Sequence, residues 1–387
     1  MGPKNNKSRK RRGRGEGGVR QRDDGLWEGR VSLGYDGNGK RRRKTVYGKS
    51  KKEALEKLRR LTSDVGVGSL PEAGSMTVAQ LLDAYLTVRK LKDAPRTFEN
   101  RQTTIDTHLR PRLGGVKLAK LTALHVEGLY AELHAAGVGA GAIENAAKVL
   151  NGALVRAVKL NLIAANPAKA VDRPKSPHRE MLFLDDSQVR AVLDAGRGAV
   201  AFPLVAAALG TGARQGELLA LMWEDVDLRA ETLQINKSLS QTKAGFVVKA
   251  PKTKAGRRTV QLPPATVEAL TLHKAAMLKA GLLSAPVFST RTGGYLNRNN
   301  VLRAFRAIVA RANRTITAAG GKPVPTEIRF HDLRHTTASL LLSKGASLVA
   351  VSSRLGHARR SITLDLYGHK MPNDDRQLAD LLNTMLA

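Results

Sequence analysis

The chain is 387 residues long, carries a formal net charge of +32 and contains no cysteine. The length predicts two or three domains, and the lack of cysteine excludes disulfides, thiolate catalysis and cysteine-ligated zinc. So large a positive charge concentrates polyanions around a protein, and nucleic acid is the expected partner. The sequence has no apolar run of 18 or more residues and no apolar stretch behind its basic start, which argues against a membrane span and a secretory signal peptide. We therefore expect a cytoplasmic, nucleoid-associated protein.

The positive charge is concentrated near the N-terminus. Residues 1–60 contain 21 lysines and arginines against 7 acidic residues. Residues 4–18 lack apolar side chains to bury, so we predict that residues 1–18 are a disordered basic arm that gains affinity for DNA through counterion release. A solubilising tail is the alternative interpretation.

Residues 19–64 predict a small β-sheet followed by one helix. Apolar residues alternate from Trp27 to Tyr35, and residues 36–39 (DGNG) predict a hairpin turn. Ser50 with Glu53 three residues later predicts a capped helix, whose buried face comprises Ala54, Leu55, Leu58 and Leu61. Such a basic sheet suits binding in a DNA groove, although a solvated charged face is the alternative. The candidate DNA-binding residues are Arg41, Arg42, Arg43 and Lys44.

The middle of the chain predicts an all-α bundle between two linkers. Residues 65–75 and 171–182 are linkers by composition. Residues 76–170 show helical periodicity, beginning at Thr77. Three further helices are predicted near Thr97–Leu109, Thr122–Ala136 and Ala142–Leu160, with Pro111 and two glycine-rich stretches separating them.

Residues 183–387 predict a helix-rich domain with a small sheet, because residues 231–240 and 257–262 alternate like strands. The predicted fold class is therefore multidomain. It combines a small β-sheet plus helix N-terminal domain, an all-α bundle and a mainly α, mixed α+β C-terminal domain.

Five motifs in this last domain carry chemically active side chains. In chain order they are GTGARQGEL from Gly210, PKTKAGRR from Pro251, HDLRH from His331, LGH from Leu355 and SITLDLYGH ending at His369. Together they resemble the tyrosine recombinase or phage integrase family, whose catalytic domains carry Arg, Lys, His-x-x-Arg, His or Trp, and Tyr in that order. The resemblance covers about residues 183–375 at motif level. More weakly, the upstream segments resemble the family's core-binding bundle and its arm-binding sheet domain.

The resemblance implies that two arginines grip the scissile phosphate, since Arg214 and Arg334 match the two family arginines. A guanidinium is a planar, permanently charged fork that binds non-bridging oxygens and stabilises the extra charge of a pentacoordinate transition state. Glycines flank Arg214 and an apolar run follows it, which predicts that it lies at a helix start beside Glu217. A solvated surface arginine is the alternative for either residue taken alone.

Tyr367 matches the family nucleophile and stands ten residues after His357. A phenol with a pKa of about 10 is a poor nucleophile at neutral pH and needs a proton acceptor and cationic surroundings. By resemblance, His331 serves as general base or proton shuttle, and His357 hydrogen-bonds the phosphate in the transition state. A buried structural aromatic is the alternative for Tyr367.

The leaving 5′-oxygen needs a proton, and by the same resemblance a lysine in a turn between strands supplies it. The run PKTKAGRR offers several candidates. We choose Lys252 as the general acid, with Lys254 as its rival.

The HDLRH motif could also bind zinc, because His331 and His335 stand at i and i+4. Zinc proteases of that pattern need glutamate at the second position, where this chain has Asp332, and Arg334 would lie close to the cation. We therefore expect no metal and no cofactor. The role of His335 stays open between a structural and a supporting one.

The family mechanism implies that Tyr367 displaces a 5′-hydroxyl and forms a 3′-phosphotyrosyl bond, which a 5′-hydroxyl of a partner duplex then attacks. It needs no ATP, and the chain has no GxxxxGK[ST] loop. The resemblance also implies a homotetramer on double-stranded DNA. The N-terminal module favours a phage or mobile-element integrase that binds core and arm attachment sites, and a DNA-bending host factor and an excisionase could assist it.

Two other functions compete with this interpretation. A non-catalytic DNA-binding regulator could have inherited the recombinase residues, but the complete catalytic set argues against it. A topoisomerase with similar tyrosine chemistry would relax any plasmid, whereas a recombinase requires its own sites. The tail after Tyr367 has an apolar helical face that could dock on a neighbouring subunit or on its own domain, formed by Leu378, Leu381, Leu382, Met385 and Leu386.

Overall fold

The computed structural model of the protein describes residues 18–35, 41–65, 76–176, 181–251, 254–367 and 383. The predicted DGNG turn, most of the basic arm and first linker, Lys252 and the apolar tail lie outside these residues. By its internal contacts the chain divides into two units, Met1–Pro177 and His178–Ala387. Across the described residues, no helix has both the length and the apolar character needed to cross a membrane.

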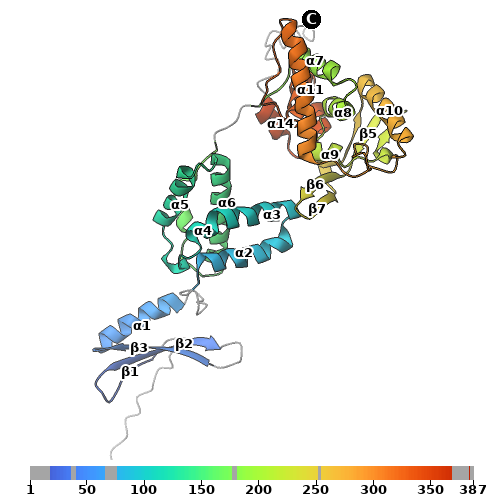
Figure 1. Cartoon of the computed structure of the whole chain (residues 1–387). Coiled ribbons are helices and arrows are strands. Elements are labelled where there is room, and N and C mark those ends of the chain that lie inside the picture. The colour runs from blue at the N-terminus through green and yellow to red at the C-terminus, as the bar shows by residue number, and fades with distance from the viewer. Residues whose placement is uncertain are drawn as a thin grey trace, which may run out of the picture. The chain divides into compact units, whose positions relative to one another are not determined.

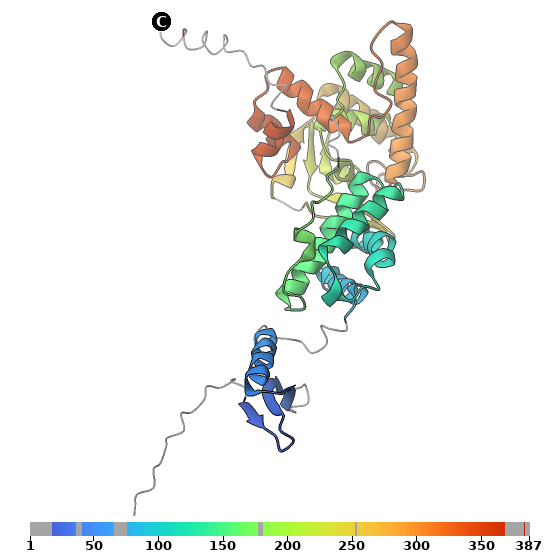
Figure 2. The same cartoon turned by 90° about the vertical axis from the view of Figure 1, so that its left-hand side faces the viewer.

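The N-terminal module is a three-stranded antiparallel sheet followed by a helix, as predicted. The strands are β1 (Gly18–Gln21), β2 (Trp27–Tyr35) and β3 (Arg41–Gly48), in the order β1-β2-β3. Helix α1 (Lys51–Val65) packs along the sheet (Figure 1 and Figure 2). The backbone N–H of Glu53 donates to the Ser50 hydroxyl at 3.2 Å, which confirms the predicted cap, and the predicted core residues Ala54 and Leu58 are buried.

The four candidate DNA-binding residues, Arg41 to Lys44, form the first half of β3. Their backbone pairs with β2 in antiparallel register, for example Lys44 opposite Val31. Their side chains lie outside the described part of the structure, so their contact with DNA stays a prediction.

The middle segment is a helical bundle around one apolar core. Thr77 and Thr122 cap two of its helices through their hydroxyl groups. Pro111 does not separate two helices as expected. A π-helical turn over Ile105–Leu109 precedes it, and because the regular hydrogen-bond pattern is already interrupted there, the missing N–H of proline does not break the helix. The helices are α2 (Val78–Lys92), α3 (Pro95–Thr104), α4 (Arg110–Leu113), α5 (Ala123–Ala135) and α6 (Ala140–Lys159).

The C-terminal unit places helices around small antiparallel sheets. Strands β4 (Val226–Asp227), β5 (Thr232–Ile235) and β8 (Arg258–Gln261) form one sheet in the order β4-β5-β8, while β6 (Ser238–Thr242) pairs with β7 (Gly245–Lys249). The strands expected in residues 231–240 and 257–262 are thus confirmed. The helices are α7 (Asp186–Gly196), α8 (Phe202–Thr211), α9 (Gln215–Leu218), α10 (Pro264–Lys279), α11 (Arg298–Ala318), α12 (Asp332–Ser343), α13 (Leu348–Leu355) and α14 (Arg360–Tyr367).

Two apolar clusters hold this unit together. The larger one joins the sheet to the helices from α7 to α12, and Figure 1 shows α11 lying beside α7. The smaller one joins α12, α13 and α14, and Tyr367 belongs to it. The motifs with chemically active side chains therefore lie on elements that the two clusters fix in place.

Candidate active site

Arg214 lies on the tight connection between α8 and α9. Helix α8 ends at Gly212 with a φ of 65°, and a Cβ atom there would lie 2.7 Å from Leu355 Cδ2, so only glycine fits. The Thr211 hydroxyl donates to the Ala207 carbonyl at 2.6 Å and accepts the Ala213 N–H at 3.1 Å. Arg214 then begins α9, as predicted, with a side chain that is 41% exposed and can reach a ligand.

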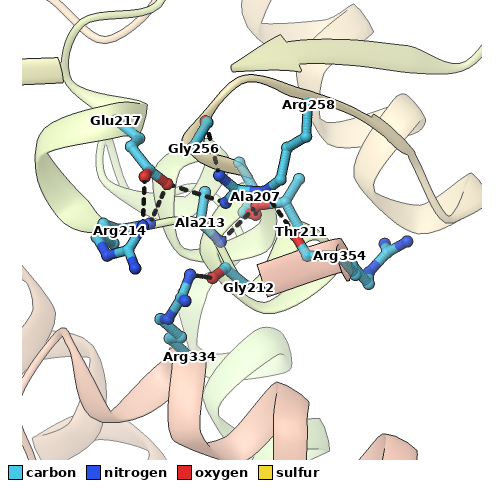
Figure 3. A network of polar contacts seen from close by, with 10 residues as sticks. All are labelled: Ala207, Thr211, Gly212, Ala213, Arg214, Glu217, Gly256, Arg258, Arg334 and Arg354. Atoms are coloured by element: carbon cyan, nitrogen blue, oxygen red, sulfur yellow. Dashed lines mark hydrogen bonds and ion pairs between the residues drawn. The ribbon is translucent and has the colours of Figure 1, made fainter. Parts of the chain in front are cut away.

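Glu217 holds Arg214 in place through two hydrogen bonds (Figure 3). The backbone N–H of Arg214 donates to Oε2 of Glu217 at 2.9 Å, and Arg214 Nη1 donates to Oε1 at 2.8 Å. Burial raises the pKa of Glu217, but Arg258 and Arg214 outweigh burial and bring that pKa below its usual value. The carboxylate is therefore ionised at neutral pH and orients one edge of the Arg214 guanidinium.

Arg334 projects from α12 and is only 3% exposed. Its Nη1 donates to the Gly212 carbonyl at 2.7 Å, which ties it to the Arg214 connection (Figure 3). Its Nη2 is buried and has no hydrogen-bond partner among the described residues. Burial, followed by the positive charge of Arg214, lowers the pKa of Arg334 to about 9, so the group is still charged at pH 7. A buried cation with an unused donor next to a second cation is unfavourable until an anion binds.

His357 follows the left-handed Gly356 that ends α13. Its Nδ1 lies 2.8 Å from the Thr363 hydroxyl, and its backbone N–H donates to the Ser352 carbonyl at 3.2 Å. Burial, then the charges of Arg334 and Arg214, lower the pKa of His357 to about 4. The ring is thus neutral at pH 7, and when Thr363 donates to Nδ1, the other nitrogen carries a proton that it can donate to a ligand.

His331 lies immediately before α12 and is exposed. Its ring contacts that of His335 edge to face, with centroids 5.4 Å apart. The residue is exposed as a whole, but its ring is partly desolvated, and this desolvation, with His335 and Arg334 nearby, lowers the pKa of His331 below its ordinary value. A neutral imidazole can accept a proton, as the expected shuttle role requires.

Tyr367 is the last described residue of α14 and is 2% exposed. Its hydroxyl lies 2.5 Å from Nδ1 of His335, and its ring packs in the small cluster with Leu342 and Leu355. Burial raises the pKa of Tyr367 to about 12, although the positive charge of Arg334 opposes this. The candidate nucleophile is therefore protonated, covered and hydrogen-bonded to a histidine.

The structure brings Arg214, Arg334 and His357 close together. Tyr367 lies beside α12, which is the helix that carries Arg334. Lys252 lies outside the described residues, as does the side chain of Lys254. The backbone directly after Lys254 is described, and a Cβ on Gly356 would lie 2.8 Å from the Ala255 carbonyl oxygen. The backbone at Ala255 thus lies next to the residue that precedes His357.

Sequence reasoning missed Arg258, which is the second partner of the Glu217 carboxylate. It named Glu217 and His335, but not that Glu217 is shared between two arginines or that His335 contacts Tyr367. The alternation of β8 was a usable signal for Arg258, because Val260, two residues later, faces the core. Among the described residues, no group of three or more histidines and acidic residues could hold a metal ion.

Comparisons with known sequences cover nearly the whole chain. The phage integrase family matches residues 183–374, and the phage integrase N-terminal SAM-like domain matches residues 77–134. An integrase of Streptomyces ambofaciens is 32% identical over an alignment of 378 residues that covers 92% of this chain and 93% of the relative. A protein named tyrosine recombinase XerC-like, from Caldanaerobacter subterraneus subsp. tengcongensis, is 28% identical over 382 residues and covers 92% of this chain and 95% of its own.

Solved structures share the fold. The Tn1549 transposon integrase in complex with transposon right end DNA matches with a TM-score of 0.68 at 20% identity, over 80% of this chain and 100% of that one. A lambda integrase tetramer bound to a Holliday junction matches with a TM-score of 0.54 at 17% identity, over 90% of this chain and 94% of that one.

The fold is shared with integrases of known structure, and the described site places two arginines and a neutral histidine close together. The sequence comparisons then identify the family. The chain belongs to the phage integrase family and is a site-specific DNA recombinase of the tyrosine class.

Proposed function

We propose that this recombinase is the integrase of a phage or other integrative element, and that it joins attachment sites through a 3′-phosphotyrosyl bond to Tyr367. One observation carries the assignment of the site: within the part of the chain that the structure describes, the buried Nη2 of Arg334 has no hydrogen-bond partner, and Arg214 lies close by. A phosphate would supply the acceptor that Nη2 lacks and the negative charge that both guanidinium groups need.

In the proposed first step, the hydroxyl oxygen of Tyr367 attacks the scissile phosphorus while the bond from phosphorus to the 5′-oxygen breaks. The leaving oxygen takes a proton from Lys252, with Lys254 as the rival donor. In the second step, a 5′-hydroxyl of the partner duplex gives its proton to the same lysine and attacks the phosphorus, and the released tyrosine oxygen takes back the phenol proton from the histidines. One phosphoester bond forms for each one that breaks, so no external energy source enters.

The contacts support a division of roles among the other groups. Arg214 and Arg334 bind the non-bridging oxygens, and His357 donates a hydrogen bond to the phosphate through its free nitrogen. The phenol proton leaves by way of the ring that Tyr367 already contacts, His335, toward His331, whose ring packs against it. Bound phosphate raises the proton affinity of these imidazoles, because it cancels part of the arginine charge that lowers their pKa values.

The rest of the chain serves DNA binding in this proposal. Residues 19–64 bind arm sites through Arg41, Arg42, Arg43 and Lys44, aided by the basic arm of residues 1–18. Residues 76–170 bind the core site, residues 183–387 carry the catalytic groups, and 65–75 and 171–182 are linkers. The separate apolar cores of the bundle and the catalytic unit support this division. Four copies act together at the nucleoid, with a DNA-bending host factor and an excisionase as further partners.

The test is a single-turnover assay on nicked DNA, in buffer with EDTA. The core site comes from random fragments that the protein protects from nuclease. A nick on the 3′ side of the cleavage position lets the short fragment with the released 5′-hydroxyl diffuse away, which traps the covalent complex. Wild type should form a protein–DNA adduct, and Tyr367→Phe should bind the site equally well and form none. If wild type binds the site but forms no adduct, the proposed mechanism is wrong and the chain acts as a binding protein.

A further inference from the structure

Arg258 is a buried arginine that joins three parts of the site without being exposed to DNA. It is the first residue of β8, and its side chain is 7% exposed. Its Nη2 donates to Oε2 of Glu217 at 2.9 Å, its Nε to the Arg354 carbonyl at 2.6 Å and its Nη1 to the Gly256 carbonyl at 3.3 Å (Figure 3).

The contact with Glu217 determines how many N–H groups of Arg214 remain free to bind a phosphate. Arg258 occupies Oε2, while the side chain of Arg214 contacts Oε1 alone. If Arg258 were absent, both carboxylate oxygens would be open to Arg214, and a bidentate pair would be the stronger arrangement. The guanidinium of Arg214 would then turn toward the protein, so that fewer N–H groups and less positive charge would face the scissile phosphate.

The contact with the Arg354 carbonyl fixes the segment that leads to His357. The side chain of Arg354 contacts the end of α8, which leads to Arg214, because its Nη2 donates to the Gly210 carbonyl at 2.5 Å. The same Nη2 donates to the Gln261 carbonyl of β8 at 2.9 Å. Gly356 packs so closely that a Cβ there would lie 2.7 Å from Nη1 of Arg258. His357 is the next residue, so a change at Arg258 displaces the backbone that carries its ring.

We propose that Arg258 is a positioning residue for strand cleavage, which aligns Arg214 through Glu217 and His357 through the end of α13. The inference rests on the proposed function, because it assumes that Arg214 and His357 act on a scissile phosphate. Arg258 touches neither the DNA nor the reacting atoms. Its loss therefore slows cleavage while leaving binding of the core site nearly unchanged.

Arg257 provides a matched control, because it is the preceding arginine and its side chain is exposed. We compare Arg258→Gln, Arg258→Lys and Arg257→Gln in the nicked-DNA assay, with the melting temperature and the core-site Kd of each. Arg258→Gln should cleave about 100-fold more slowly, as expected when reacting groups are misplaced by a fraction of a bond length. Its Kd should change by less than about threefold, and Arg257→Gln should cleave like wild type.

Arg258→Lys separates the contact with Glu217 from the contact with the Arg354 carbonyl. It also serves as the test variant if Arg258→Gln unfolds at assay temperature. A lysine ammonium can still donate to Glu217 but has no planar fork to reach the Arg354 carbonyl as well. Cleavage by this variant should lie between those of wild type and Arg258→Gln, about tenfold below wild type.

A substrate with a methylphosphonate at the scissile position distinguishes alignment from general stability. The methyl group removes the negative charge that Arg214 neutralises, so the deficit of Arg258→Gln should shrink at least about tenfold on this substrate. Equal deficits on both substrates, or wild-type cleavage by Arg258→Gln, would overturn the proposal. Failure of the wild type to form any adduct would instead refute the proposed function.

Discussion

The arginine half and the tyrosine half of the site differ in how ready they are for the reaction. Arg214 and Arg334 are held by Glu217 and the Gly212 carbonyl, and each keeps donors for a ligand. Tyr367, by contrast, is 2% exposed, and its hydroxyl is hydrogen-bonded to His335. In the proposed mechanism, the arginines of the phosphate position are therefore in place before DNA binds, whereas Tyr367 has to leave its buried contact before it can attack.

The electrostatics of the two halves agree with this difference. A pKa of about 9 leaves Arg334 charged at neutral pH, while a pKa of about 12 leaves Tyr367 protonated. An arriving phosphate therefore finds its cations in place, but the phenol must still lose its proton. A substitution in one half of the site should therefore leave the contacts of the other half unchanged.

Arg334→Gln should give the largest effect on the arginine half. Loss of one preorganised charged donor typically slows a reaction by about 10²–10³-fold, and we expect a loss of that size in the single-turnover cleavage rate. The free energy of unfolding should hardly fall, because the surroundings of Arg334 disfavour its buried charge and lower its pKa to about 9. Cleavage at the wild-type rate would mean that the phosphate does not bind at Arg334.

The pH dependence of stability sharpens the account of His357. Its pKa is about 4 in the folded chain against 6.5 ordinarily, so the neutral ring stabilises the fold fully above pH 6.5, and this contribution is lost as the pH falls toward 4. Between pH 7 and pH 5 the free energy of unfolding should fall by about 1–2 kcal/mol from this group. Urea titrations of wild type and His357→Gln measure it, and equal pH slopes for the two proteins would contradict the assignment.

The smallest expected effect concerns the tyrosine half. A double-mutant cycle of Tyr367→Phe and His335→Leu should yield a coupling free energy of about 1 kcal/mol in urea unfolding, as for one buried hydrogen bond. Additive effects of the two substitutions would show that the hydroxyl is not held by His335 in solution. The same cycle with His331→Leu in place of His335→Leu serves as a control and should show weaker coupling.

Much of the arginine half was predictable because its determinants are local. Glycines around Arg214, and Glu217 three residues later, are enough to predict a capped helix start. The β-strand pattern and the capped helix of the N-terminal module are local in the same way. The order of the motifs then indicates a family, and with it the candidate roles of Arg334, His357 and Tyr367.

The contacts that hold the site could not be predicted, because they join residues far apart in the chain. Arg258 meets Glu217 across 41 positions and the Arg354 carbonyl across 96. In PKTKAGRR the two adjacent arginines look alike, and the fold alone turns one inward. His335 likewise gains its meaning from Tyr367, which lies 32 positions away.

The most direct test of the account is to identify the residue that becomes joined to DNA. The adduct trapped on nicked core-site DNA is digested with nuclease and trypsin, and the modified peptide is sequenced by mass spectrometry. Cleavage after Arg360 and Lys370 yields SITLDLYGHK, in which Tyr367 is the only tyrosine. The account predicts a nucleotide 3′-phosphate on Tyr367. A nucleotide on Ser361, on Thr363 or on any other peptide would contradict it.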